Sequence, residues 1–330
     1  MAKSDNSFII GVDLGGTKIS AGAVSEDGAR IVGVRSIETQ AELGAEGVVD
    51  RIIGLIEGVI LDATQETAAK RKDFVGIGLG APGPLDRKNG VVIVAPNLGW
   101  RDFPLRDRVT SRLGLPATLD NDANCATVGE WWLGAARGGR NVVGITIGTG
   151  IGGGLIINGE LYHGSSDVAG EIGHTTIDVN GRHCKCGNYG CLEAYASGPA
   201  IATRAREALV REDTASALRT MVNGQIDKIT AETVYQAAKQ GDTLANEIVR
   251  DTARYLGAGI ATLLNVVNPD VVVVAGGVTF AGEALFGPLR AEVRRRAFSP
   301  AVKAARIVPA ELTGTAGIVG AVKTFMLARG

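Results

Sequence analysis

Two stretches of the chain repeat one pattern of hydrophobic and glycine positions. Residues 10–28 and residues 143–159 each contain an apolar run, a glycine turn, a second apolar run and a further turn. Short apolar runs bounded by glycine predict a strand, a tight turn, a second strand and a hairpin turn into a third strand. Because the order is the same in both stretches, the sequence predicts a duplicated domain.

The segments around these repeats alternate between helical and strand patterns. Apolar side chains recur at helical spacing over residues 48–60, 253–267 and 315–329, whereas residues 75–79 and 271–275 are short apolar runs that lead into glycine. The first pattern predicts amphipathic helices, and the second predicts buried strands. Alternating strands and helices in two similar halves predict an α/β protein of two lobes with a cleft between them.

The chain is long enough for two domains. Its 330 residues exceed the size at which a single hydrophobic core usually stops growing. We place the boundary near Asp120 and expect the last helix to return to the first lobe. The predicted small lobe therefore contains residues 1–120 and 315–330, and the predicted large lobe contains residues 121–314.

Composition narrows the functional classes. Apolar residues make up 45% and charged residues 21% of the chain, which is typical of a soluble globular protein, and the formal net charge is -1. The balance of basic and acidic residues gives no sign of a basic surface for nucleic acid. The apolar run from Phe8 to Leu14 is too short for a signal peptide or a membrane span. We therefore expect a cytoplasmic protein that binds neither nucleic acid nor membranes and whose cysteines are reduced.

The glycine turn of the first repeat carries groups that suit a phosphate. A P-loop needs Gly-Lys-Ser/Thr followed by a helix, but Gly15, Gly16, Thr17 and Lys18 stand in a different order and an apolar strand pattern follows them. We therefore expect a hairpin whose tip offers backbone N–H groups, a hydroxyl and an ammonium group to a phosphate. Asp13, at the end of the first strand, is placed to hold a metal-bound water.

Two further glycine clusters follow predicted strands. Gly148, Thr149 and Gly150 form the turn of the second repeat, which would bind phosphates through amides and one hydroxyl because it has no charged side chain. Gly276 and Gly277 end a later strand. Each cluster alone is also compatible with an ordinary tight turn, but the matched positions of the first two in a repeat favour a shared ligand.

Three of the four cysteines lie within eight residues of one another. Cys184, Cys186 and Cys191 follow His174 in a segment rich in glycine, and three thiolates with one imidazole complete a tetrahedral zinc site. Because four protein ligands leave no open position, we expect the zinc to be structural. The alternative is three unrelated cysteines beside a core histidine, which their close spacing in a reduced protein disfavours.

Acidic and amide side chains gather at the end of the first half. Asn121 and Asp122 together offer a hydrogen-bond donor, acceptors and a carboxylate that could serve as the base for a substrate hydroxyl. The alternative is that Asp120 or Asp122 only caps the helix predicted over residues 123–133. The sequence favours neither aspartate for either role.

Taken together, these segments resemble the ROK family of sugar kinases and sugar-responsive repressors. The most specific part is the string from Cys184 to Glu193, Cys-Lys-Cys-Gly-Asn-Tyr-Gly-Cys-Leu-Glu. The other matching segments are spread over nearly the whole chain: Asp13–Lys18, Gly80–Pro84, Asn121–Asn124, Gly148–Gly150, Glu171–His174 and Gly276–Gly277. The resemblance implies a two-lobed actin/hexokinase-like fold, a duplicated ribonuclease H-like arrangement with an interlobe cleft. It also implies ATP-dependent phosphorylation of the 6-hydroxyl of a free hexose, with glucose as the first candidate and glucokinase as the activity.

The resemblance implies roles for individual residues. Asp122 is the expected base for the sugar hydroxyl, and Asp13 is expected to orient Mg²⁺ through water. The expected sugar ligands are Asn97, Asn121, Asp122, Glu171, His174 and Glu193. The expected ATP contacts are Gly15, Gly16, Thr17, Lys18, Gly148, Thr149 and Gly150 for the phosphates, and Gly276 and Gly277 for the adenosine. We expect ATP, Mg²⁺ and a structural Zn²⁺ as cofactors, and a homodimer or homotetramer.

Three alternatives stay open. The sugar could be fructose, mannose, allose or an N-acylated amino sugar, because shared polar groups do not set selectivity. The phosphoryl donor could be polyphosphate, although the balanced charge gives no sign of a basic channel. The chain could be a sugar-responsive transcriptional regulator, which we disfavour because the first predicted strand begins by Phe8 and leaves no room for a preceding helix-turn-helix.

Overall fold

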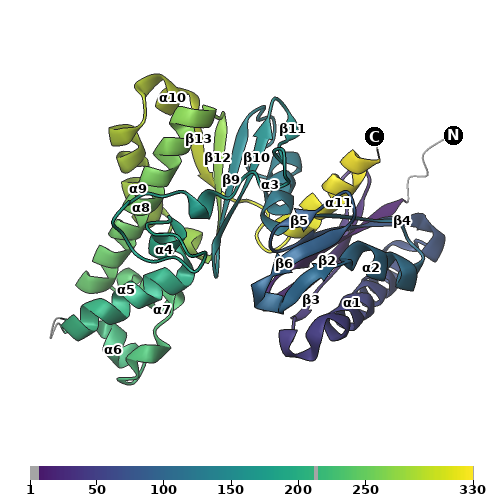
Figure 1. Ribbon diagram of the computed structural model, residues 1–330, viewed down its shortest axis with the longest axis horizontal. Helices are drawn as coiled ribbons and strands as arrows, with labels where there is room; N and C mark the ends of the chain where they lie inside the picture. Colours follow the sequence, from purple (N-terminus) through teal and green to yellow (C-terminus); the bar gives the residue numbers. More distant parts are fainter. Residues whose placement is uncertain (1–6, 212–214, 330) are drawn as a thin grey trace. The chain divides into compact units, whose positions relative to one another are not determined.

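The computed structural model describes residues 7–211 and 215–329, and the chain divides into two compact units (Figure 1). The first unit takes in residues 1–138, 154–170 and 311–330, and the second takes in residues 139–153 and 171–310. The structure contains two five-stranded sheets and one three-stranded sheet with helices, which is the mixed α/β class that the sequence predicts.

The division differs from the boundary that we expected near Asp120. Residues 121–138 stay with the first unit because α3 (Asp122–Trp132) packs against the last helix, α11 (Ala316–Ala328). Residues 154–170 also belong to the first unit, so the chain passes between the units more often than the pattern of elements suggested.

The first unit is built on a sheet of strand order β3-β2-β1-β4-β8. Its strands are β1 (Phe8–Leu14), β2 (Lys18–Ser25), β3 (Ile31–Glu38), β4 (Phe74–Ala81) and β8 (Ala117–Asn121). A smaller sheet contains β5 (Leu85–Asp86), β6 (Val91–Ala95) and β7 (Trp100–Phe103), and the further helices are α1 (Gly44–Thr67) and α2 (Leu105–Leu113). Strands β1, β4 and β8 are parallel, so their carboxyl ends lie at one edge of the sheet.

The alternation of side chains along β1 gives this sheet two buried faces. Phe8, Ile10 and Val12 belong to the core that includes the apolar stripe of α1, whereas Ile9 belongs to the core formed with α11. Successive side chains of a strand point to opposite faces, so a strand covered on both sides needs apolar residues at every position. Burial on both faces explains why β1 does not alternate between apolar and polar residues.

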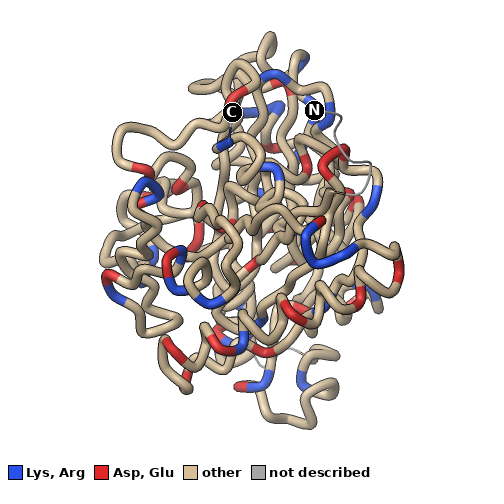
Figure 2. Tube along the Cα trace, turned by 90° about the vertical axis from the view of Figure 1, so that its right-hand side faces the viewer, with Lys and Arg blue, Asp and Glu red and all other residues tan. Residues whose placement is uncertain are grey.

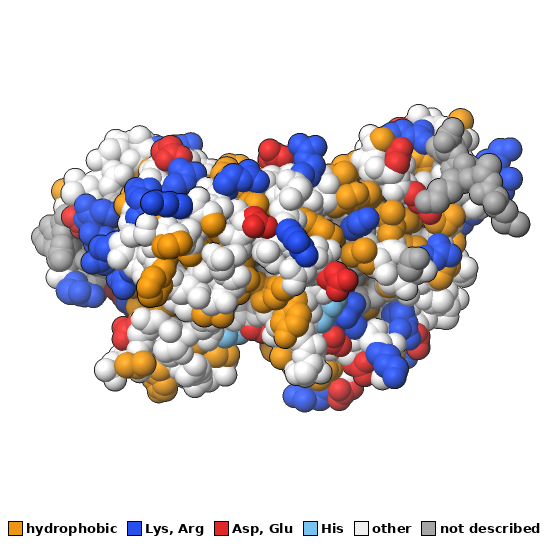
Figure 3. Space-filling view, turned by 90° about the horizontal axis from the view of Figure 1, so that it is seen from above, with side chains coloured by type: hydrophobic (Ala, Val, Ile, Leu, Met, Phe, Trp, Pro, Cys, Tyr) orange, Lys and Arg blue, Asp and Glu red, His pale blue; other side chains and the backbone are white. Residues whose placement is uncertain are grey.

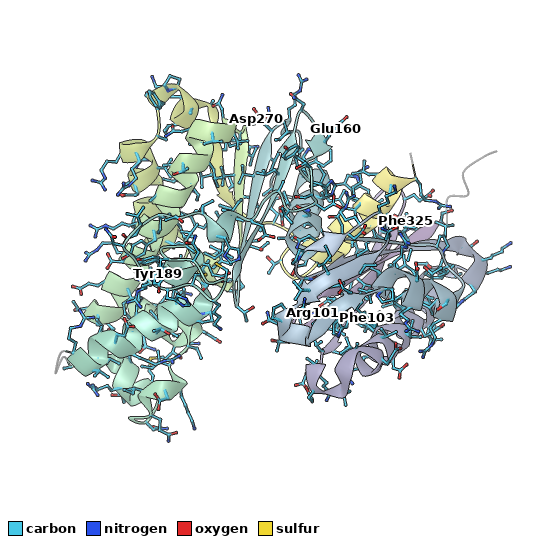
Figure 4. All side chains as sticks on the ribbon, in the orientation of Figure 1. Arg101, Phe103, Glu160, Tyr189, Asp270 and Phe325 are labelled. Carbon is cyan, nitrogen blue, oxygen red and sulfur yellow. The ribbon has the colours of Figure 1, made fainter. Side chains whose placement is uncertain are left out.

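Glycine replaces larger side chains where α11 crosses the sheet. A Cβ added to Gly11 of β1 would lie 2.1 Å from the carbonyl oxygen of Ile318, and one added to Gly78 of β4 would lie 1.8 Å from that of Ala321. Both distances are far below van der Waals contact, so only glycine permits this approach. Figure 4 labels Phe325 on the same helix, and its ring occupies the space that a side chain at Gly76 would need.

The second unit contains most of a sheet of strand order β11-β10-β9-β12-β13, and the division between the units passes through β10. The strands are β9 (Val142–Ile147), β10 (Ile151–Ile157), β11 (Glu160–Leu161), β12 (Val271–Gly276) and β13 (Arg306–Pro309). The helices are α4 (Glu193–Ala196), α5 (Gly198–Arg211), α6 (Ala217–Met221), α7 (Ala231–Lys239), α8 (Thr243–Val267), α9 (Glu283–Arg296) and α10 (Ser299–Ala304). Asp270, labelled in Figure 4, ties β9 to β12 by accepting hydrogen bonds from the N–H groups of Arg140 and Asn141 at 2.8 and 2.7 Å.

The predicted repeat is confirmed as strand, turn, strand, turn, strand in both stretches, although β11 has only two residues. The helix predicted over residues 253–267 begins ten residues earlier, at Thr243. Its start is set by Asp242, whose carboxylate accepts the N–H of Ala245 at 2.8 Å and so caps the helix. The apolar pattern of the sequence therefore missed the more polar first turns.

Charged residues of both signs are mixed along the described trace (Figure 2) and on the face shown in Figure 3. The chain has 34 basic and 35 acidic residues and a formal net charge of -1. Among the described residues, no helix is both long enough and apolar enough to cross a membrane.

Candidate active site and zinc site

The first glycine turn forms the tip of the hairpin between β1 and β2. The N–H of Gly15 donates to the carbonyl oxygen of Lys18 at 2.9 Å, and the side chains of Thr17 and Lys18 are exposed. Thr39 braces the tip, because its hydroxyl donates to the carbonyl of Gly15 at 2.7 Å and its N–H donates to that of Thr17 at 2.8 Å. A strand follows the turn, so the predicted hairpin is confirmed and a P-loop is excluded.

Asp13 lies beside this tip, where β1 pairs with Gly80 of β4. Its carboxyl group packs against the first turn of α11, since a Cβ added to Gly317 would lie 2.5 Å from its Cγ. Burial raises the pKa of Asp13 to about 6, although the ammonium group of Lys18 acts in the opposite direction. A bound cation would favour the ionised form, which is the form that can hold a metal-bound water.

Asn97 lies next to the same tip. It belongs to a single 3-10 turn, Pro96–Leu98, and its side chain is exposed. A Cβ added to Gly16 would lie 3.1 Å from the Cβ of Asn97, so the two residues are neighbours although 81 positions separate them in the chain. The first unit therefore brings one predicted sugar ligand to the predicted phosphate loop.

Asn121 and Asp122 lie at the carboxyl end of β8, at the same sheet edge as the hairpin tip. The Oδ1 atom of Asn121 accepts the N–H groups of Ala123 and Asn124 at 2.9 and 3.2 Å, so Asn121 is the N-cap of α3. Asp122 is the first residue of the helix and is half-buried. The N-cap is therefore Asn121 and neither aspartate, so the capping role that the sequence offered for Asp120 or Asp122 falls to a third residue.

The two aspartates of this turn have different surroundings. Asp120 is 2% exposed and accepts hydrogen bonds from Arg87 Nε at 3.1 Å and His163 Nε2 at 2.9 Å. Burial alone would raise the pKa of Asp120, but the His163 hydrogen bond and the Arg87 charge hold it below its ordinary value. A buried carboxylate with these bonds is not available to a substrate, so Asp122 is the better candidate for a base.

The second glycine turn joins β9 to β10 in the second unit. The N–H of Gly148 donates to the carbonyl of Gly150, and the carbonyl of Gly148 accepts from the N–H of Gly198 at the start of α5, both at 2.9 Å. Gly148 and Thr149 are exposed. The first glycine of each turn donates the hydrogen bond that closes it, but the acceptor is three residues ahead in the first turn and two residues ahead in the second.

Gly276 ends β12 in a conformation that other residues rarely adopt. Its φ is +107°, and a Cβ added to it would lie 1.9 Å from the carbonyl oxygen of Ile147 in β9. Gly277 begins a 3-10 helix, Gly277–Ala281, and a Cβ added there would have no neighbour within 4 Å. Gly276 is therefore required by its own strand, whereas Gly277 leaves open backbone at the strand end.

The predicted zinc ligands lie together in the second unit. The ligand atoms of His174, Cys184, Cys186 and Cys191 are all within 4.8 Å of one another. Cys184 Sγ lies 3.9 Å from His174 Nδ1, and Cys186 Sγ lies 3.7 Å from Cys191 Sγ. A tetrahedral zinc with Zn–S bonds of about 2.3 Å needs S···S separations of about 3.8 Å, so the four residues fit zinc.

The chemistry of the thiols also suits a metal. Burial and the neighbouring thiols raise the pKa of Cys191 to about 12, whereas a backbone N–H lowers the pKa of the exposed Cys186. Three thiolates at this spacing would repel one another unless a cation bound them. The set is therefore consistent with a divalent metal held by one nitrogen and three sulfur atoms.

Glu193 connects the predicted zinc ligands to the second glycine turn. It begins α4, and its Oε2 accepts the N–H of Ile151 at 2.8 Å, directly after Gly150. Its Oε1 lies 3.9 Å from Cys184 Sγ. Glu171 is exposed and precedes the 3-10 turn Ile172–His174, which places it three residues before the imidazole.

Three further side chains contact the candidate residues: Arg87 and His163 bind Asp120, and Thr39 binds Gly15. No pattern in the sequence predicts these contacts. They have no motif spacing to mark them, because each acts on a residue that is distant in sequence. Glu193 was named as a sugar ligand, but its hydrogen bond to Ile151 was not anticipated.

A family model described as "ROK family" matches residues 9–328. The chain belongs to the ROK family. It is 39% identical over 314 residues to the glucokinase of Thermotoga maritima, and the alignment covers 95% of each chain. Its structure matches the crystal structure of a ROK family glucokinase from Streptomyces griseus in complex with glucose and AMPPNP, with a TM-score of 0.83 and 39% identity over 96% of this chain and 99% of that one.

A protein named as a repressor is also among the relatives. A putative xylose repressor of Caldicellulosiruptor sp. is 34% identical over 317 residues, which are 96% of this chain and 77% of that protein. The predicted actin/hexokinase-like fold is confirmed by the match to ROK glucokinase structures.

Proposed function

We propose that this protein is an ATP-dependent kinase that transfers the γ-phosphoryl group of ATP to the 6-hydroxyl of a free hexose, with glucose as the substrate. The observation that carries the proposal is the match, over nearly the whole length of both chains, to a ROK glucokinase whose structure holds glucose and AMPPNP. A ligand-bound relative of this similarity supports both a sugar site and a nucleotide site in this chain.

Asp122 accepts the proton of the sugar 6-hydroxyl in this proposal. Asp122 is half-buried at the first turn of α3, where the helix dipole favours a negative charge. Because phosphoryl transfer has a loose transition state, the base has to orient the hydroxyl and take the proton late in the reaction. Asn97 and Asn121 would hold neighbouring hydroxyls through their amide groups.

The two glycine turns bind the phosphates of ATP through backbone N–H groups and the hydroxyls of Thr17 and Thr149, with Lys18 adding a positive charge. Gly276 and Gly277 border the adenosine, where the open space at Gly277 allows a ligand to approach. Asp13 would hold Mg²⁺ through water, and Mg²⁺ supplies charge neutralisation for the phosphates.

Glu171, His174 and Glu193 bind the remaining sugar hydroxyls. His174, Cys184, Cys186 and Cys191 would hold a structural zinc, which would fix the tautomer and orientation of the imidazole and leave its other ring nitrogen as a positioned donor. The cytoplasmic location and the homodimeric or homotetrameric state belong to the same proposal and rest on the sequence alone.

The test is a coupled assay of ADP formation with ATP and a panel of glucose, fructose, mannose, allose and N-acetylmannosamine. We expect glucose to give the highest kcat/KM. A higher value for another sugar would replace glucose in the proposal, and phosphorylation with polyphosphate in place of ATP would change the donor. Specific binding to operator DNA without phosphorylation of any sugar would favour a regulator, as the repressor relative suggests.

The same assay tests the base. Asp122→Asn keeps the side-chain shape but removes the basic group, so kcat should fall by roughly 10²-fold or more while the KM for glucose changes less. Asp50→Asn is the matched control, because it removes one carboxylate from an exposed ion pair with Arg112. Near-normal turnover of Asp122→Asn would show that another group is the base.

A further inference from the structure

We infer that Asp120 is a positioning residue that holds two segments of the sugar site together: the turn that carries Asp122 and the loop of residues 163–170 that leads to Glu171. The inference rests on the proposed function, because these segments carry the proposed base and a proposed sugar ligand. All of the contacts that support it lie within the first unit.

Both carboxylate oxygens of Asp120 are used. Oδ1 accepts the N–H of Asn121 at 2.8 Å and the side-chain amide of Asn124 at 3.1 Å. Oδ2 accepts Arg87 Nε at 3.1 Å and pairs with His163 Nε2 at 2.9 Å. Because an ionised carboxylate can only accept, His163 must carry its proton on Nε2 and donate.

The Oδ1 side of this network defines the turn around Asp122. Asn121 and Asn124 lie on either side of Asp122 in the sequence, and both donate to the same oxygen. Among the described residues, the Oδ1 atom of Asn124 is buried without a hydrogen-bond partner, so its amide is oriented through the bond to Asp120. The buried carboxylate of Asp120 thus fixes the start of α3 through its hydrogen bonds to Asn121 and Asn124.

The Oδ2 side holds the loop. Arg87 contacts both Asp120 and Asp167, and its Nη1 atom lies 3.5 Å from the Oδ1 atom of Asp167. Within the loop, the N–H of Ala169 donates to the carbonyl of His163 at 3.0 Å. Asp167 has a φ of +58°, in the left-handed region that costs free energy for a residue other than glycine. Side-chain anchors at both His163 and Asp167 therefore maintain a loop conformation that its backbone alone disfavours.

The hairpin tip proposed for ATP has a separate support. Thr39 braces it through Gly15 and Thr17, and the Asp120 network makes no hydrogen bond to it. Loss of the His163 donor should therefore affect sugar and turnover while leaving ATP binding nearly unchanged. A residue that only stabilised the fold would affect both substrates together.

The test compares His163→Leu, which removes the donor, with His163→Gln, whose amide nitrogen can still donate to Asp120. We expect kcat/KM for glucose to fall by at least about 10-fold in His163→Leu, which corresponds to about 1.4 kcal/mol, and the KM for ATP to change less than about twofold. His163→Gln should retain activity within about threefold. Arg112→Met, which breaks an exposed ion pair of the same unit, should behave as the unmodified protein.

Hydrogen exchange measures the anchor without relying on turnover. His163→Leu should speed exchange in residues 119–126 and 161–170, and His163→Gln should restore protection. Arg87→Met serves as a second donor deletion, because Arg87 is 30% exposed and a methionine keeps its stem, so this variant should fold even where His163→Leu does not.

Three results would overturn the inference: equal losses in His163→Leu and His163→Gln, equal changes in the Michaelis constants for glucose and ATP, or exchange that is unchanged in both segments. Failure of the proposed function would give a different result. The unmodified protein would phosphorylate no hexose, whereas hydrogen exchange would still be faster in His163→Leu than in His163→Gln.

Discussion

Replacement of Cys184 tests how the zinc ligands act on the sugar. Cys184 Sγ lies 3.9 Å from His174 Nδ1 and 3.9 Å from Glu193 Oε1. Cys184→Ala removes one of the four predicted zinc ligands, so we expect the metal to be lost, the imidazole of His174 to turn freely and the segment from Cys184 to Glu193 to loosen. Two sugar hydrogen bonds would weaken together.

The expected size follows from those bonds. At about 1 kcal/mol for each of two hydrogen bonds, the loss is about 2 kcal/mol, or about 30-fold in the KM for glucose. ATP is affected only through the single bond from Ile151 N–H to Glu193, just after Gly150, which limits its loss to about 1 kcal/mol, or about 5-fold. Glucose binding should therefore suffer several times more than ATP binding.

The assay measures zinc by elemental analysis, folding by circular dichroism and the two Michaelis constants separately. The unmodified protein should contain one zinc per chain, and Cys184→Ala should contain none. Cys125→Ala is the control, since Cys125 is fully buried and far in sequence from the zinc ligands. Equal losses for both substrates, or a normal KM for glucose in zinc-free protein, would refute the reasoning.

Two further predictions concern buried carboxylates. Because the pKa of Asp13 is raised to about 6 from the ordinary value of 3.8, the folded protein without Mg²⁺ binds more protons than the unfolded chain between these values. Its free energy of unfolding should fall by up to roughly 3 kcal/mol as the pH rises through that window, and kcat/KM for ATP should rise through about pH 6. Both pH dependences should vanish in Asp13→Asn. If urea unfolding and kcat/KM for ATP depend on pH in this variant as they do in the unmodified protein, Asp13 is not the titrating group. Glu130 is 2% exposed, and it accepts the N–H groups of Ala135, Glu311 and Leu312 at 2.8, 3.0 and 2.7 Å. Glu130→Gln should therefore lower the free energy of unfolding in urea by about 2–4 kcal/mol, because the amide nitrogen of glutamine would face N–H donors. A loss below about 0.5 kcal/mol, as expected for an exposed carboxylate, would show that these hydrogen bonds contribute little.

Local patterns in the sequence predicted much of this protein. The duplicated strands were predictable because apolar runs and glycine turns recur with the same order in residues 10–28 and 143–159. The cluster of His174 with Cys184, Cys186 and Cys191 was predictable because the three cysteines fall within eight residues of the chain. In both cases the physical cause operates over a few residues of chain, so the sequence displays it directly.

The tertiary structure decided what depends on residues distant in sequence. It separated the two aspartates of one turn, because Asp120 is bound by His163 and Arg87, which are 43 and 33 positions away. It also explained glycine inside strands, since Gly11 makes room for the backbone of Ile318 in a helix at the opposite end of the chain. Hydrogen bonds and close packing between such partners produce no periodicity along the chain, so only the folded arrangement shows which of the two carboxylates is held by His163 and Arg87.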